Sequence, residues 1–369
     1  MENKKVKIIL FIILVLIIIS IVTLIGIYNE EIAEKAKEIQ EIITQSSLKS
    51  TEGIEIVPTM QDEISEDTVW CCTFQLIWND LKDEIAKQDI IFNEEVEEAA
   101  NLNKAEFNTN MISDDYYYKK YGIMNSELKK EIEKGIKEKF GETSSILNDF
   151  DWSDEGNNKY FLYSMLKRKF EFYYVFDDLE KGNFGDNYQN VSYFGIDEKT
   201  KNEVRSQVEV IYYNSKDDFA IQINTKQNDE VIICKGNEGK TFKEIYDKVN
   251  NTEYNGSKSL SSTENLKIPN LEFKEKKEFT NLENKGFALS TGEIYTIDKA
   301  VQTIEFNLDK KGGEVKSEAG MGIVKSALPV EQEENREFNV DNTFTLFLRE
   351  NGKELPYFAA RISDITKFQ

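Results

Sequence analysis

The sequence contains no histidine in its 369 residues. Histidine is the side chain that titrates nearest neutral pH, the most frequent general base and a common zinc ligand. Its absence excludes Ser-His and Cys-His nucleophile pairs and histidine-ligated metal centres. Carboxylates and lysines can also transfer protons, so an enzyme is disfavoured as a class without being excluded.

Cysteine is scarce as well, with only Cys71, Cys72 and Cys234. Neighbouring cysteines are poorly placed to bridge each other, and no pair has the spacing of a metal site. We therefore predict buried, unbridged cysteines, no metal and no cofactor. A bridge from Cys234 to one of the other two remains the alternative if the domain lies outside the cell.

Positive charge is in deficit, because 46 Lys and Arg residues face 68 Asp and Glu residues and the formal net charge is −22. Contacts from Lys and Arg supply most of the affinity for a phosphate backbone, so nucleic acid is not an expected partner. Abundant Lys, Asn, Ile and Glu with only four prolines is typical of AT-rich genomes, and we expect a bacterial envelope protein.

One long apolar run lies near the N-terminus. Residues 8–28 carry no charge, and about 20 such residues are the length that a helix needs to cross a bilayer. Three lysines precede the run and two glutamates follow it closely. This asymmetry places residues 1–7 in the cytoplasm and the bulk of the chain outside, so we predict a single-pass protein of the cell membrane.

A cleaved signal peptide is the alternative for this run, but its apolar core would be shorter and the small-residue cleavage site is missing. We therefore expect an uncleaved signal-anchor. Residues 29–50 would form a helical stalk and joint, with Ile32, Ala36 and Ile39 on one side of the helix. Residues 51–369 would form one extracytoplasmic domain.

Within that domain the spacing of apolar residues changes once. Intervals of three and four predict helices at 68–87, 94–104 and 125–140. From residue 160 onward, alternating β-branched and aromatic residues predict antiparallel strands, interrupted by helical segments at 241–251 and 281–287. Helices followed by many antiparallel strands indicate an α+β fold with large sheets.

The segment 310–340 combines two patterns that rarely occur together. Alternation places one set of residues on one face (Val315, Ser317, Ala319, Met321 and Ile323) and a charged set on the other (Glu314, Lys316 and Glu318). Several glycines and a polar stretch that follows are instead typical of an exposed loop. A plain surface loop with coincidental alternation is the simplest interpretation. The alternative is a loop that can also become a strand.

Three motifs in the C-terminal part occur in a distinctive order. The first is an apolar-x-Pro-x-Phe strand pair followed by a short segment ending in Gly, carried by Ile268, Pro269, Phe273, Leu282, Gly286 and Phe287. The second, at 298–314, is a long strand that runs into paired glycines. The third is a closing hairpin with Phe344 in one strand and Phe358 to Ile362, including Arg361, in the next. In this order the motifs resemble the serpins, the protease-inhibitor superfamily.

An upstream segment, 162–176, is similar to a strand of the main serpin sheet. The matching residues are Leu162, Leu166, Lys169 and Phe176. Ser164 stands where Asn is usual in that family, and Phe172 stands where Trp is usual. Both positions lie where the main sheet opens in serpins, so these departures bear on whether this sheet can open. Residues 73–81 also resemble the first serpin helix.

The resemblance implies a serpin-like fold with an exposed reactive loop at 313–337 and no catalytic centre. The implied hinge consists of Gly312, Gly313, Glu314, Val315, Ser317 and Ala319, and the implied cleavage region of Lys325, Ser326 and Ala327. The implied function is suicide-substrate inhibition of a serine or cysteine protease. After the cut, the hinge would insert into the main sheet and the acyl-enzyme would be trapped.

Two other functions remain open. A non-inhibitory binding or structural module at the cell surface is favoured by Ser164, Phe172 and Val315, because Val is bulkier and stiffer than the alanine usual after the hinge glycine. An enzyme or a calcium site would use a second set of residues, Asp149, Asp151 and Asp154. That set has neither the spacing of a paired acid and base nor the glycine and terminal glutamate of a calcium loop.

Overall fold

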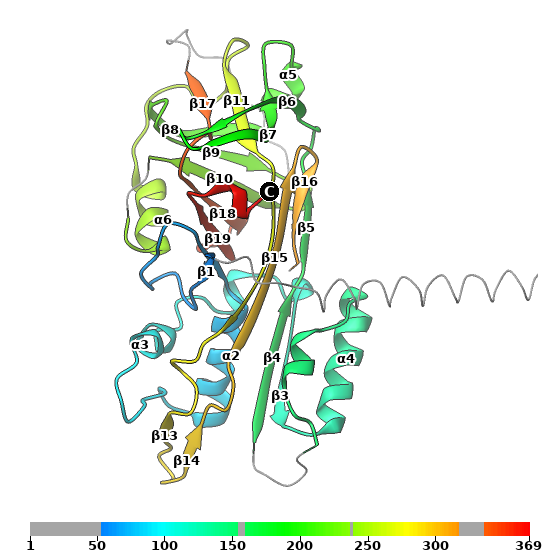
Figure 1. The fold of residues 1–369 in the computed structure, drawn as a ribbon, viewed down its shortest axis with the longest axis vertical. Helices are drawn as coiled ribbons and strands as arrows, with labels where there is room; N and C mark the ends of the chain where they lie inside the picture. The colour runs from blue at the N-terminus through cyan, green and yellow to red at the C-terminus, as the bar shows by residue number, and fades with distance from the viewer. Residues whose placement is uncertain (1–52, 154–158, 237–238, 317–335) are drawn as a thin grey trace, which may run out of the picture. The chain divides into compact units, whose positions relative to one another are not determined.

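The computed structural model describes residues 53–153, 159–236, 239–316 and 336–369. Most of its helical residues precede residue 141, and most of its strands follow residue 159 (Figure 1). The expected α+β fold is therefore confirmed. No helix among the described residues is long and apolar enough to cross a bilayer. The predicted anchor and stalk lie outside these residues.

The described strands form three larger sheets and two separate pairs. The largest, which we call the central sheet, has the order β1 (Glu55–Ile56), β2 (Thr68–Cys71), β19 (Phe358–Ile362), β18 (Phe344–Glu350), β10 (Asp229–Lys235), β9 (Asp218–Asn224) and β8 (Val208–Ser215). The second has the order β17 (Glu337–Asn339), β11 (Asn265–Pro269), β7 (Tyr188–Ile196) and β6 (Asp177–Phe184). The third, which we call the hinge sheet, has the order β12 (Leu271–Glu278), β15 (Val301–Asp309), β16 (Gly312–Val315) and β5 (Arg168–Glu171).

Shorter elements complete the described chain. The two pairs are β3 (Tyr117–Ile123) with β4 (Tyr160–Leu166), and β13 (Gly286–Ala288) with β14 (Ile294–Thr296). The α-helices are α2 (Thr73–Asp80), α3 (Glu97–Asn103), α4 (Ser126–Phe140), α5 (Asn202–Arg205) and α6 (Phe242–Asn251). A π-helical turn, η1 (Leu81–Ala86), continues α2, and 3-10 turns lie at η2 (Thr109–Met111), η3 (Asp114–Tyr116), η4 (Ile146–Asp149) and η5 (Ile365–Lys367).

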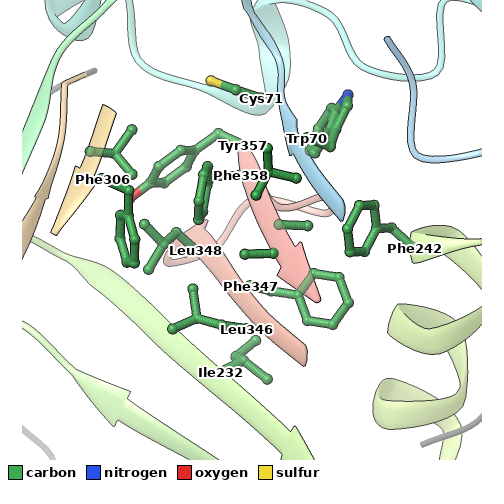
Figure 2. Packing of buried hydrophobic residues seen from close by; sticks show 14 of the residues in the cluster. Trp70, Cys71, Ile232, Phe242, Phe306, Leu346, Phe347, Leu348, Tyr357 and Phe358 are labelled. Carbon is green, nitrogen blue, oxygen red and sulfur yellow. The ribbon is translucent and has the colours of Figure 1, made fainter. Parts of the chain in front are cut away.

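The central sheet is covered on both faces. Every residue of β10 is buried, as expected for a continuous apolar run in a sheet interior. Phe347 of β18 packs edge-on against Phe242 and Tyr246 of α6, with ring centroids 6.2 and 5.3 Å apart. On the other face, Phe358 of β19 stacks on Phe306 of β15 at 4.8 Å (Figure 2). The main core therefore lies between α6 and the hinge sheet.

A second, smaller core lies between α4 and the pair β3–β4, and we call these elements the α4 lobe. The Asn125 side chain caps α4 by accepting a hydrogen bond from the Leu128 backbone at 2.8 Å. Gly141 ends the helix with φ 69°. The buried residues of this core come from both elements and include Leu128, Ile132, Ile136, Phe161 and Tyr163. The period of the apolar residues thus fixes which face of α4 is buried.

The structure corrects two predicted helices. The helix expected at 68–87 begins only at Thr73, because residues 68–71 form β2 and pair with β19. The helical segment expected at 281–287 is wrong, since residues 286–288 form β13. The helices expected near α3, α4 and α6 are confirmed within three residues of their ends. The three cysteines are buried and unbridged, as predicted.

Candidate functional site at the hinge strand

The predicted hinge residues form a strand with a neighbour on each side (Figure 1). Strand β16 pairs antiparallel with β15, with Val315 opposite Phe306. It also pairs antiparallel with β5, with Val315 opposite Arg168. Gly312, Gly313, Glu314 and Val315 are therefore already seated inside the hinge sheet.

The two hinge glycines are required by close backbone approaches. Gly312 has φ +148°, and a Cβ at this position would lie 2.1 Å from the carbonyl oxygen of Phe170. A Cβ at Gly313 would lie 2.4 Å from the carbonyl oxygen of Asn307. Any larger residue would push β16 away from β5 or β15. The paired glycines thus allow a strand to fit between two others.

Hydrogen bonds to the backbone fix the turn that leads into β16. The backbone N–H groups of Phe172 and Phe176 donate to the carbonyl oxygens of Lys311 and Lys310, at 2.8 and 2.9 Å. Phe172 is 1% exposed, and its ring lies 5.0 Å from that of Phe176. It fills the core at the position where serpins usually have Trp.

Hinge residues alternate between two environments. Gly313 and Val315 are buried, with Val315 only 1% exposed, whereas Glu314 and Lys316 are partly exposed. The ladder with β15 continues past the strand, because the Lys316 N–H donates to the Glu305 carbonyl oxygen at 3.4 Å. The remaining predicted hinge residues, Ser317 and Ala319, and the predicted cleavage region, Lys325, Ser326 and Ala327, lie outside the described residues.

Two strand edges extend in the direction that β16 takes. Among the described residues, β15 pairs from Val301 to Ile304 only with β12. Strand β4, which precedes β5 in the chain, pairs there only with β3. Unpaired strand edges can accept a further strand. Ser164 lies in β4, and its buried hydroxyl has no hydrogen-bond partner in the described part of the chain.

A buried ionic cluster holds β5 against the central sheet. The Arg168 side chain is fully buried, pairs with Asp229 of β10 and donates to Glu350 of β18 at 3.0 Å. Its guanidinium carbon lies 5.0 Å from the ring centroid of Tyr116 and 4.7 Å from that of Tyr357. Arg168 lies opposite Val315 in the ladder, so this cluster fixes the position of the strand on which the hinge strand is seated.

Burial and pairing act differently on the two carboxylates of the cluster. Burial raises the pKa of Asp229 to about 7, although Arg168 and the Tyr357 hydroxyl partly oppose this shift. Burial would also raise the pKa of Glu350, but hydrogen bonds from Ser113 and the charge of Arg168 outweigh it and lower that pKa. One cation thus compensates two buried anions, and Asp229 is the one that takes up a proton near neutral pH.

The far end of the loop is anchored separately. Arg336 is the first described residue after the loop, and it binds both carboxylate oxygens of Glu264, at 2.6 and 3.0 Å. It also donates to the Tyr254 hydroxyl at 2.7 Å and to the Ser257 carbonyl oxygen at 2.6 Å. A bidentate, buried arginine of this kind is strongly positioned. The chain then enters β17.

The acidic residues at 149–154 are not brought to the hinge as a group. Asp149 pairs with Lys276 at 2.7 Å, and Asp151 accepts hydrogen bonds from the Ser153 side chain and backbone at 2.6 and 2.9 Å. These bonds lower the pKa of Asp151. Asp154 lies outside the described residues. Within the described residues no three Cys, Asp or Glu side chains gather into a metal site.

Sequence reasoning missed the charged residues that surround the hinge. Arg168, Asp229 and Glu350 each lie at the end of a strand, where charged residues are common and attract no attention. The one available signal was Arg168, which shares the inward face of β5 with the buried Phe170. An isolated charge on an apolar face predicts a buried partner without identifying it.

No protein-family model matches this sequence, and no curated protein matches it. Solved structures similar to the chain are serpins. One is Serpin48 of the insect Tenebrio molitor, with 12% identity over 82% of this chain and 92% of that chain and a TM-score of 0.47. Another is human thyroxine-binding globulin in complex with its hormone, with 14% identity over 64% of this chain and 63% of that chain and a TM-score of 0.36.

These likenesses concern the fold alone. The chain's own elements carry the serpin-like order that the motifs predict. The pair β11 and β12 comes first, the long strand β15 then runs into the hinge glycines, and the hairpin β18–β19 closes the chain. The predicted serpin-like α+β fold is confirmed in this sense.

The buried cluster makes stability depend on pH in a defined direction. A folded pKa of about 7 for Asp229, against an ordinary value of 3.8 for an aspartate, contributes stability that is fully present below pH 4 and lost as the pH rises through 7. In Asp229→Asn this contribution disappears. We expect the difference in unfolding free energy between the wild type and the variant to fall by about 3 kcal/mol between pH 5 and 8.

Denaturant unfolding at several pH values would measure this difference. The control is Asp247→Asn, because Asp247 lies on α6 and pairs with Lys243 at 2.7 Å as a partly exposed ion pair. The difference in unfolding free energy between the wild type and Asp247→Asn should stay nearly constant over the same pH range. A flat profile for the Asp229 variant would contradict the assignment of the titrating group.

Proposed function

We propose that this protein is a serpin-like inhibitor that a serine or cysteine protease cuts within the loop 313–337, near Lys325, Ser326 or Ala327. The enzyme's nucleophile forms an ester or thioester with the residue before the cut, and the amine of the next residue leaves with a proton. The freed N-terminal part of the loop then inserts beside β15. The single observation that supports this mechanism best is that β16 already occupies the first positions of that strand.

The register of β16 supports insertion of the residues that follow it. If the register is continued, Ser317 falls between Ile304 of β15 and Leu166 of β4, which are both buried. Ala319 falls between Gln302 and Ser164. The positions from 313 to 323 that would face inward carry no charge, whereas Glu318 would face outward with Glu314 and Lys316. The sequence alternation thus continues a register that the structure contains.

Insertion would be favoured by pairing two strand edges at once. About seven additional residues would form ladder hydrogen bonds with β4, and about four of them also with β15. At a net value of roughly 0.5–1.5 kcal/mol for each bond, this gives on the order of 10 kcal/mol. Burial of apolar side chains adds to this gain. The uncut loop stores this free energy, and the cut releases it.

The anchored far end would separate the two sides of the cut. Arg336 and Glu264 hold the start of β17 beside β11. While the N-terminal part of the loop moves along β15, the C-terminal part would therefore stay in place. A protease attached to the moving end would be carried away from its original position.

A non-inhibitory binding or structural module is the second candidate. Val315 is bulky, and the Ser164 hydroxyl is buried on β4. These features favour a loop that stays where it is.

We further propose that residues 8–28 anchor the protein in the cell membrane, with residues 1–7 inside and the domain outside. The lysines before the apolar run and the glutamates after it support this orientation. An acidic domain outside the cell would attract basic partners by long-range electrostatics. A protease with a basic surface is the partner that fits this charge.

Nicking the loop tests the insertion. The full-length chain in detergent micelles is treated with a trace of protease, and mass spectrometry confirms a cut between residues 320 and 337. We expect the melting temperature to rise by ~20 °C or more, because an additional 10 kcal/mol corresponds to roughly that shift. A protease that the loop inhibits should also form an adduct that survives denaturation.

Two variants sharpen this test. Ser317→Arg places a charge at an inward position and should abolish the rise, because insertion would bury an unpaired cation. Glu318→Arg, its matched control, places the same side chain at an outward position and should leave the rise intact. An unchanged melting temperature after nicking of the wild type would favour the binding module.

Cysteine labelling in intact cells tests the anchor. Glu198 lies in an exposed turn of the domain, and Asn3 lies before the apolar run. A membrane-impermeant maleimide should label Glu198→Cys in intact cells and Asn3→Cys only after lysis. The wild type is the control for background labelling, since its cysteines at 71, 72 and 234 are buried. Labelling of Asn3→Cys in intact cells would contradict the orientation.

A further inference from the structure

The outward side of the hinge strand carries a small group of alternating charges. Lys316 contacts the Glu142 carboxylate at 2.6 Å, and Lys167 contacts Glu142 and lies 3.9 Å from Glu314. Their side chains are between 15 and 31% exposed. We call these four residues the hinge clasp. It joins two hinge residues to two residues that are not part of the loop.

Glu142 belongs to the α4 lobe. It follows Gly141, the residue that ends α4, and α4 packs on its own small core. The same segment continues to Asp149, which pairs with Lys276 of β12 at 2.7 Å. The segment that leaves α4 is therefore tied to the hinge strand near one end and to the far strand of the hinge sheet near the other.

The charges of the hinge clasp stabilise the contacts of Glu142 with Lys167 and Lys316. Burial raises the pKa of Glu142, but hydrogen bonds from Lys167 and Lys316 outweigh burial and lower it, so the carboxylate is ionised at neutral pH. Two cations share one anion, and Lys167 is also near a second anion, Glu314. A network of partly buried charges is worth more than an isolated exposed pair.

The neighbours of β16 are held to the rest of the fold more firmly than β16 itself. Arg168 ties β5 to the central sheet, and the stack of Phe306 on Phe358 ties β15 to it. In β16, Gly312 and Gly313 carry no side chain, and Val315 is the only apolar side chain of the strand. The backbone ladder, the hinge clasp and the one buried side chain of Val315 therefore supply its attachment.

We propose that Glu142 is a positioning residue that keeps Gly312–Lys316 seated between β15 and β5 and thereby couples the position of the hinge to the α4 lobe. The seating itself is independent of protease inhibition, whereas its consequence for the reaction rests on the proposed function. Because Lys316 would keep its register when the loop inserts, the clasp holds the start of the new strand before and after the cut. When Gly312–Lys316 are already in the sheet, fewer residues remain to be inserted after the cut. Insertion is then faster relative to hydrolysis of the acyl-enzyme, which would release the protease.

Hydrogen exchange of the uncut protein tests the seating. The amides of Gly313 to Lys316 report on it directly, and the full-length chain in detergent micelles is used without any protease. Glu142→Gln removes the charge and keeps the shape of the side chain. We expect exchange at these amides to become faster by about two- to five-fold, the range for a partly exposed ionic network.

A double-mutant cycle separates the clasp from general loosening. Lys316→Gln should raise exchange as Glu142→Gln does, and the double variant should exchange no faster than the faster single variant. The matched control is Lys274→Gln, because Lys274 of β12 pairs with Glu305 of β15 at 2.6 Å with similar exposure. The Lys274 pair uses the Glu305 side chain and contacts no residue of β16, and the Glu305 carbonyl that accepts the Lys316 N–H is left in place. Its loss should therefore leave exchange at 313–316 unchanged.

The outcomes are distinct. Unchanged exchange in both single variants, or effects that simply add in the double variant, would overturn the positioning role. Should Glu142→Gln fail to fold, the wild type at about 0.05 M and 1 M salt provides the same test. Exchange at 313–316 should then rise with salt, and salt-independent exchange there would overturn the role.

A kinetic measurement separates this inference from the proposed function. If the loop inhibits a protease, Glu142→Gln should consume more inhibitor molecules per enzyme trapped, whereas Lys274→Gln should match the wild type. If no protease is inhibited, the proposed function fails, but the exchange result still decides the role of Glu142. If inhibition is seen and exchange is unaffected, only the role of Glu142 fails.

Discussion

The fit of a strand between two others at residues 312–315 is the constraint on which the site depends. Strand β16 meets the Phe170 carbonyl on one side and the Asn307 carbonyl on the other, at distances that a Cβ atom could not tolerate. Paired glycines remove that obstacle but contribute no side chain to hold the strand. The hinge is therefore held mainly by its backbone ladder, by the charges next to it and by the single buried side chain of Val315.

The strands on either side are held in a different way. Arg168 lies buried among Asp229, Glu350 and two tyrosine rings, and links β5 to the central sheet. Such a cluster is weak evidence for net stability, because desolvation offsets much of its attraction, but it fixes geometry. On β15 the aromatic stack with Phe358 does the same. Strands β5 and β15 are thus fixed to the central sheet, and β16 between them is held less firmly. Within this part of the hinge sheet, β16 is the strand that can move most easily.

An inhibitor and a binding module would share this architecture. They differ in how much the folded protein is stabilised when residues beyond Lys316 enter the sheet. They also differ in whether the cut loop is inserted before the protease is released. The anchored Arg336 and the clasped Lys316 define the two ends of the loop in either case. The proposed anchor would place this work at a membrane surface, and the acidic charge of the chain would favour a basic partner.

Local patterns in the sequence determined much of this protein. The caps and apolar periods of α4 and α6 fix two helices, and the alternation around Val315 matches the faces that the structure gives to the hinge. These features depend on neighbouring residues, so a single sequence contains them. Only the tertiary structure decided that Thr68–Cys71 is a strand, because pairing with β19 overrides a helical spacing that continues into α2. It alone brought Glu142 to Lys316 and Arg168 to Asp229 and Glu350, since charged residues far apart in the chain carry no local sign of which partner the fold will give them.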